Sequence, residues 1–201
     1  MRRLRAGLLV LLVTAAGQVA AEGGYPPALV SYDDYRRLVA EVEAHRASRL
    51  VDLDTFIDMS RRPDVIVLDA RSAYRYQRLH IQGARHLEFA DFTQDTLRQI
   101  IPSFDTTILI YCNNNFAGDP PDFPSKVVLP VLAPDRSSAP ADQSAPSMMM
   151  ALNVPTYINL YGYGYRNVYE LDELVDMDDP RISFAGSVVD AGLLPGGELA
   201  R

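Results

Sequence analysis

Short apolar runs alternate along the chain with segments in which apolar residues recur at helical spacing. The runs at 65–68 and 107–111 are dominated by apolar and β-branched residues, which is typical of parallel strands buried on both faces of a sheet. Helical spacing or helix-capping residues mark four other segments, at 31–42, 52–59, 72–79 and 92–101. Because parallel strands need long crossover connections, usually helices, this alternation predicts an α/β domain with a mainly parallel sheet.

The remaining segments are less regular. Residues 50–51 and 166–171 are predicted to be strands, the second of them at an edge of the sheet. Residues 85–87 lead into a further strand or a loop, and 125–132 are predicted to form a short helix. The pattern at 156–160 suits either a strand or a helix, and the sequence leaves this open.

The first residues have the features of a secretory signal. Three arginines precede a short apolar run at 6–17, and small residues lead to a cleavage position before Glu22, so we interpret residues 1–21 as a signal peptide. The run is shorter than the roughly 18–20 apolar residues of a membrane-spanning helix. We therefore expect an exported protein, periplasmic or secreted, with no stable membrane anchor after cleavage; a retained N-terminal anchor is the alternative.

Composition divides the rest of the chain into three parts. A linker and a helix occupy 22–48, a domain occupies 49–175, and a tail occupies 176–201. Within the domain, residues 133–147 are rich in Ala, Pro and Ser and are predicted to be a low-complexity surface insertion.

The charge balance excludes some partners. The chain has a net charge of −7 at pH 7, and removal of residues 1–21 leaves 16 basic and 26 acidic side chains, a net charge of −10. An acidic surface argues against binding to nucleic acid or to anionic membranes. Three histidines and one cysteine show no metal-ligand spacing, so we expect no metal site. The sequence indicates no cofactor and identifies no protein partner.

Cys112 is the only cysteine, and it directly follows the predicted strand 107–111. The carboxyl ends of the strands form the edge of an open α/β sheet at which ligands bind, so this thiol is the candidate nucleophile. A single cysteine excludes an internal disulfide, and an unpaired thiol is unusual in an oxidising compartment. The alternative is an inert buried cysteine.

Three motifs in order resemble the signatures of rhodanese-like domains, over residues 50–172. They are Asp69-x-Arg71 with Tyr76 and His80-Ile81-x-Gly83-Ala84, then an apolar strand ending in Cys112, then Gly164-Tyr165-x-Asn167-Val168-Tyr169-x-Leu171. The resemblance implies a single domain with a five-stranded, mainly parallel sheet and helices on both faces. It further implies a thiolate at Cys112 that takes the outer sulfur of a donor such as thiosulfate, holds it as a persulfide, and passes it to cyanide or a thiol.

The resemblance also assigns roles to other residues. We expect four signature residues to be structural, with a base at His80 as the alternative: Asp69, Arg71, His80 and Gly83. Backbone N–H groups of the loop after the cysteine would cradle an anion, and the candidate residues are Asn113, Asn114, Asn115, Phe116, Ala117 and Gly118. Asparagine tolerates left-handed backbone conformations, which would bring these N–H groups together; a simple turn is the alternative.

The loop departs from the family pattern at one position. Active members carry an arginine five residues after the cysteine, where this chain has Ala117, and the next basic residue is Lys126. Lys126 or Arg136 would have to supply the missing charge. Cys112 and Gly164 are also 52 residues apart, a longer spacing than the family's.

Three functions remain open on the sequence alone. The favoured hypothesis is an exported enzyme of the sulfurtransferase type, with a small sulfur-containing anion as donor and a thiol as acceptor. A catalytically silent rhodanese-like binding or regulatory module is the second, and the missing arginine favours it. A redox-responsive thiol protein is the third.

Overall fold

The structure, a computed structural model, describes residues 25–118, 121–128 and 147–193. The chain divides into two compact units, residues 1–31 and 32–201, and every helix and strand of the described residues belongs to the second. The predicted signal peptide and nearly all of the predicted insertion at 133–147 lie outside the described residues.

Five parallel strands form the central sheet, in the order β1-β9-β5-β2-β4. Their bounds are β1 Leu50–Val51, β9 Val168–Leu171, β5 Thr107–Tyr111, β2 Val65–Asp69 and β4 Arg85–His86. The two strands predicted from apolar runs, β2 and β5, are neighbours, with Ile66 opposite Ile108. The predicted fold class, a single α/β domain with a mainly parallel five-stranded sheet, is confirmed.

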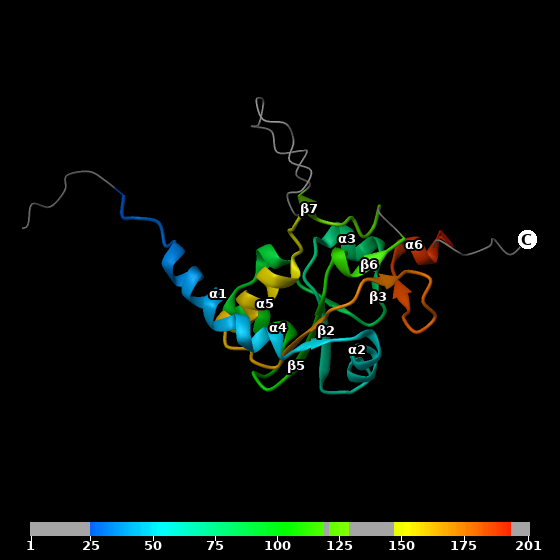
Figure 1. Ribbon diagram of the computed structural model, residues 1–201, viewed down its shortest axis with the longest axis horizontal. Helices are drawn as coiled ribbons and strands as arrows, with labels where there is room; N and C mark the ends of the chain where they lie inside the picture. The colour runs from blue at the N-terminus through cyan, green and yellow to red at the C-terminus, as the bar shows by residue number, and fades with distance from the viewer. Residues whose placement is uncertain (1–24, 119–120, 129–146, 194–201) are drawn as a thin grey trace, which may run out of the picture. The chain divides into compact units, whose positions relative to one another are not determined.

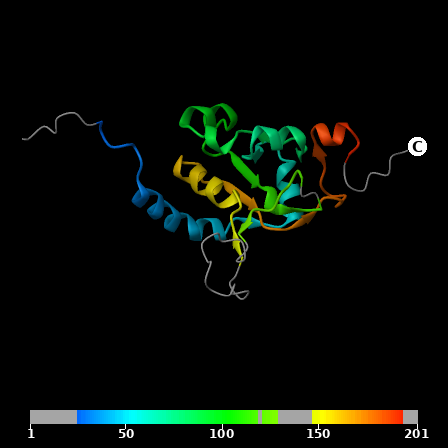
Figure 2. The same ribbon diagram turned by 90° about the horizontal axis from the view of Figure 1, so that it is seen from above.

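Helices cover both faces of this sheet (Figures 1 and 2). Alternate residues of β5 point to opposite faces, so Ile108 and Ile110 belong to one core cluster while Leu109 and Tyr111 belong to the other. The first cluster is completed by α1 (Tyr32–Ala47), α4 (Gln94–Ile100) and α5 (Asn153–Gly162). The second is completed by α2 (Leu53–Ser60), α3 (Ala73–Arg78) and α6 (Ser187–Asp190). None of the described helices is long and apolar enough to cross a membrane.

Local capping explains why several predicted helices begin where they do. The side chain of Asp52 accepts a hydrogen bond from the backbone N–H of Thr55 at the start of α2, and Ser72 does the same for Arg75 at the start of α3. Thr93 and Thr96 form a reciprocal capping box at the start of α4. These side chains satisfy N–H groups that have no partner within the helix.

The strand predicted at 166–171 is present as β9, but its predicted edge position is wrong. It lies between β1 and β5, and Glu170 is almost completely buried there. Arg46 of α1 makes this possible, because its Nε and Nη2 atoms donate to the two Glu170 carboxylate oxygens at 2.6 Å each. The undecided segment at 156–160 is helical and belongs to α5.

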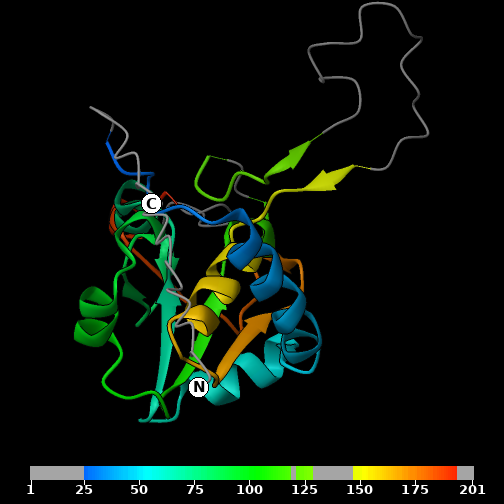
Figure 3. The same ribbon diagram turned by 90° about the vertical axis from the view of Figure 1, so that its left-hand side faces the viewer.

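The helix predicted at 125–132 is wrong for the part that is described. Residues Val127–Val128 form strand β7, which pairs antiparallel with β8 (Met148–Met149). This two-stranded ribbon extends beyond the carboxyl ends of the central strands (Figure 3). Cross-strand pairing between segments about 20 residues apart in the sequence thus overrides the local pattern.

The core extends past the predicted end of the domain at residue 175. Strand β6 (Phe116–Ala117) pairs with β10 (Val175–Asp176), and β3 (His80–Ile81) pairs with β11 (Phe184–Ala185). Side chains beyond residue 175 enter the second core cluster: Met177, Ile182, Phe184 and Val188. The segment predicted as a tail is therefore part of the folded domain up to α6.

Truncation of Phe184 tests this assignment. Its ring is buried and contacts Phe116 and Phe123, with ring centroids 5.3 and 5.9 Å away. We expect Phe184→Ala to lower the free energy of unfolding by about 3–5 kcal/mol, measured by urea denaturation. Leu193→Ala is the control, since this side chain is exposed and should change stability by less than about 0.5 kcal/mol. Equal stability of the two variants would show that the segment is not part of the core.

Candidate active site

Strands β2 and β5 end side by side, with Asp69 opposite Tyr111. The residues that follow them, Arg71 and Cys112, therefore emerge at the same edge of the sheet. This edge is where parallel α/β folds bind ligands.

A buried ion pair occupies this edge. The Arg71 guanidinium donates to Asp69 through Nε and through Nη2, the latter at 2.6 Å from Oδ2, and the two side chains are at most 2% exposed. Tyr111 donates its hydroxyl to the same Oδ2 atom, and Nη2 of Arg71 also donates to the carbonyl oxygen of Leu79. All of these partners are internal, so Asp69 and Arg71 have the contacts of a structural pair.

Arg71 remains charged in its buried position. Burial alone would lower the pKa of Arg71, but its hydrogen bonds to Asp69 and the negative charge of Asp69 raise it above its usual value. The pKa of Tyr111 is raised by burial and by the Asp69 charge, so its hydroxyl remains a hydrogen-bond donor. Arg71 is thus a buried, charged guanidinium, and its Nη1 atom reaches the loop after Cys112 by donating to Oδ1 of Asn113 at 3.2 Å.

Cys112 itself is a free thiol and is only 1% exposed. Its carbonyl oxygen accepts from the backbone N–H of Asn115 at 3.1 Å, and its own N–H donates to the side-chain Oδ1 of Asn115 at 2.9 Å. The nucleophile is thus held at a defined position but is closed to solvent in this conformation.

The loop after Cys112 does not form the predicted cradle. Asn113–Asn115 form a single 3₁₀ turn, and among the described residues no side-chain-bearing residue has a positive φ, so the predicted left-handed asparagines are absent. Two loop N–H groups are used within the turn, those of Asn115 and Phe116. Phe116 is buried in the core, Ala117 pairs with β10, and Gly118 packs beside Met177.

The asparagines instead anchor the loop. Asn113 accepts from Nη1 of Arg71, while Asn114 pairs with the backbone of Lys126, accepting from its N–H and donating to its carbonyl oxygen. Asn115 accepts from the N–H of Cys112 and donates to the carbonyl oxygens of Leu171 and Glu173. Asn115 therefore ties the end of β5 to the end of β9.

Asn153, which sequence reasoning missed, completes this network. Its Nδ2 donates to Oδ1 of Asn115 at 2.9 Å, because the other contacts of Asn115 leave only an acceptor facing it. The Oδ1 atom of Asn153 is buried and has no hydrogen-bond partner. An unpaired buried acceptor of this kind costs about 1–3 kcal/mol.

His80 and Gly83 lie in and after β3 and have structural contacts or geometry of their own. Nδ1 of His80 donates to the carbonyl oxygen of Tyr76 at 2.6 Å, and the ring of Tyr76 stacks on both His80 and His86. Gly83 has a φ of +83°, which favours glycine in the turn before β4. The placement of His80 is that of a packed structural residue.

A cationic cleft of about 320 Å³ opens at this edge of the sheet. Its charged lining residues come from three segments: Arg71, Arg75, Glu88 and Lys126. The hydrogen bonds of Asn114 to the Lys126 backbone hold that segment beside the loop. Lys126 was a sequence candidate for the missing cation, whereas Arg75 carried no sequence signal, because only the fold brings α3 to the cleft.

No group of three or more His, Cys, Asp or Glu side chains among the described residues is placed to hold a metal ion.

Residues 52–119 match the family model of the rhodanese-like domain. The match includes Asp69, Arg71, His80 and Cys112, so the resemblance seen in the sequence motifs is confirmed. None of the curated proteins matches the chain.

Two solved structures are similar to this chain. A protein from Bacillus halodurans has 20% sequence identity and a TM-score of 0.37, over 69% of this chain and 73% of that one. The polysulfide-sulfur transferase homodimer from Wolinella succinogenes has 10% identity and a TM-score of 0.37, over 72% of this chain and 91% of that one. At these scores the fold assignment rests on the strand order and on the family match.

Replacement of Asn115 tests whether it holds the loop. Asn115→Ala leaves the Cys112 N–H and the Leu171 carbonyl oxygen without their partner, so we expect the free energy of unfolding to fall by about 2–4 kcal/mol in urea denaturation. Asn114→Ala is the matched control; its partners are exposed and can bind water, so we expect a loss below about 1 kcal/mol. A loss for Asn115→Ala no larger than the control's contradicts this role.

Proposed function

We propose that this chain is a sulfurtransferase-type protein that carries sulfane sulfur as a persulfide on Cys112. The cationic cleft beside the Cys112 loop carries this proposal, because it supplies the positive charge that the loop itself lacks at Ala117. The match to the rhodanese-like domain supports it at the level of the family.

The transfer consists of two displacements at sulfur. The Cys112 thiolate attacks the outer sulfur of a donor such as thiosulfate; the new S–S bond forms as the donor's S–S bond breaks, and sulfite leaves with the electron pair. An acceptor thiolate then attacks the outer sulfur of the persulfide. The acceptor becomes the persulfide, and the thiolate of Cys112 is restored.

The cleft gives the donor a place to bind. Thiosulfate is a small dianion, and the cleft of about 320 Å³ is lined by the half-buried Arg75, the exposed Lys126 and the buried Arg71. Arg71 also stabilises the negative charge that passes between the thiolate and the persulfide.

Access to the thiol is the step that the loop controls. Because Cys112 is 1% exposed, transfer requires local opening of residues 112–115. The burial of the thiol favours a second candidate function, a silent module that binds an anion in the cleft without chemistry at Cys112.

Sulfur loading separates the two candidates. We expect intact-mass spectrometry after incubation with thiosulfate to show a gain of one sulfur atom that cyanide or a thiol removes. Cys112→Ser should abolish the gain while the fold, followed by circular dichroism, is unchanged.

Arg75→Ala should raise severalfold the thiosulfate concentration that gives half-maximal loading. Arg36→Ala is the control, since Arg36 is an exposed arginine of α1 outside the cleft. No loading by thiosulfate or polysulfide would leave the silent module as the function.

We further propose that the protein is exported. The basic, apolar and small-residue segments of residues 1–21 support this. When the full gene is expressed in a bacterial host, we expect the protein in the periplasm or the medium with Glu22 as its first residue, determined by N-terminal sequencing. A replacement of Ala21 by Arg should block cleavage, whereas an uncleaved wild-type protein in the cytoplasm contradicts export.

A further inference from the structure

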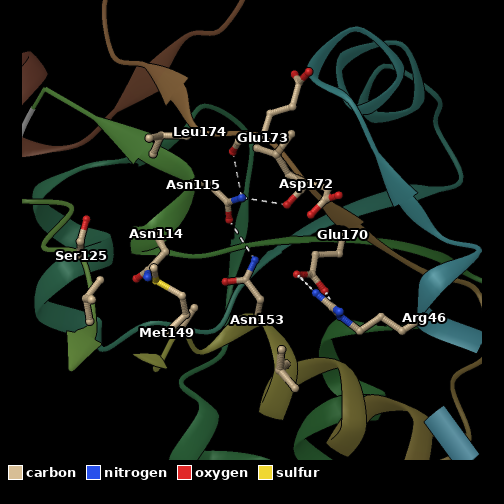
Figure 4. A pocket seen from close by; sticks show the side chains of 14 residues that line it. Arg46, Asn114, Asn115, Ser125, Met149, Asn153, Glu170, Asp172, Glu173 and Leu174 are labelled. Atoms are coloured by element: carbon tan, nitrogen blue, oxygen red, sulfur yellow. Dashed lines mark hydrogen bonds and ion pairs between the residues drawn. The ribbon is translucent and has the colours of Figure 1, made fainter. Parts of the chain in front are cut away.

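A second pocket includes Asn114 and Asn115 of the Cys112 loop in its lining, and most of its charged lining residues are acidic (Figure 4). Its volume is about 600 Å³, and it shares no lining residue with the cationic cleft. Residues that are neighbours in the sequence line different sites. Asn113 and Leu152 line the cationic cleft, whereas Asn114 and Asn153 line the second pocket.

Carboxylates dominate the charge of this pocket. Glu170 is neutralised by its bidentate pair with Arg46. Asp172 and Glu173 remain, and one oxygen of Glu173 also accepts from the N–H of Leu53 at 2.8 Å. The charged lining residues therefore sum to a net negative charge, which attracts cations and repels anions.

Asn153 supplies an independent indication of a ligand. Its side chain, on a residue 5% exposed, projects from the start of α5 toward the middle of the ring of lining side chains (Figure 4). Its Oδ1 has no partner, and the contacts of Asn115 prevent the amide from turning its donor that way instead. The wall of the pocket thus holds a buried acceptor without a partner, which a donor group that enters beside it would satisfy.

We propose that this pocket binds a small primary ammonium compound with a short aliphatic chain. An ammonium group has three donors and no acceptor, which suits an orphan carbonyl oxygen in the wall of a pocket whose net charge is negative. The rest of the lining is apolar and suits the chain: Val127, Met149, Val154 and Leu174. This site does not depend on sulfur transfer at Cys112.

A titration of the full chain with n-butylammonium tests the proposal. We expect a saturable shift of the Asn153 side-chain amide resonance in two-dimensional NMR, with a dissociation constant in the millimolar range that suits so small a ligand. Butyrate and butan-1-ol have the same carbon chain without the positive charge. They should bind at least about tenfold more weakly.

Charge variants separate this pocket from general surface attraction. Asp172 is exposed, so Asp172→Asn should leave the fold unchanged and weaken butylammonium binding severalfold. Asp178→Asn makes the same charge change at an exposed position outside the pocket and should leave binding unchanged. The proposal would be overturned if both variants had similar effects or if butan-1-ol bound as tightly as butylammonium. It would also be overturned if no saturable shift appeared, which is the result expected if only water satisfies the Asn153 oxygen.

Discussion

The buried ion pair between Asp69 and Arg71 is the interaction on which the carboxyl edge of the sheet depends. Neither side chain could be buried alone, since removal of one partner from such a pair costs about 3–5 kcal/mol. Its remaining hydrogen bonds reach Tyr111 on the next strand, the carbonyl oxygen after α3 and Asn113 in the loop. One pair of charges thus sets the relative positions of three segments around the thiol.

The same pair places a guanidinium at the end of β5, 5.4 Å from the centre of the Tyr111 ring. In the family pattern the cation comes from the loop, five residues after the cysteine, but here that position is occupied by Ala117 and the loop side chains are used as anchors. The guanidinium of Arg71 lies against the loop instead, where its Nη1 atom donates to Oδ1 of Asn113 at 3.2 Å. Because Asp69 holds Arg71 in place, the positive charge of Arg71 is preorganised. Access to the buried thiol of Cys112 then depends on the loop that follows it.

The loop also divides the surface into two regions of opposite charge. Neighbouring residues line different pockets: Asn113 and Lys126 line the cationic cleft, whereas Asn114 and Val127 line the acidic pocket. Cations gather on one side and carboxylates on the other. Asn115 lies in the wall of the acidic pocket and holds the backbone of Cys112, so the two regions are linked through one side chain.

Local pattern in the sequence by itself determined the strands β2 and β5, the capped helices between them and the place of Cys112 at a strand end, because periodicity and capping depend on neighbouring residues. Tertiary structure decided what depends on distant partners. Arg46 allows Glu170 to lie inside the sheet, the pairing of β7 with β8 replaces a predicted helix, and long-range hydrogen bonds turn the predicted anion cradle into an anchored turn. The burial of the Cys112 thiol and the formation of the two pockets both require segments that are distant in the sequence to meet. A local sequence pattern does not encode such meetings.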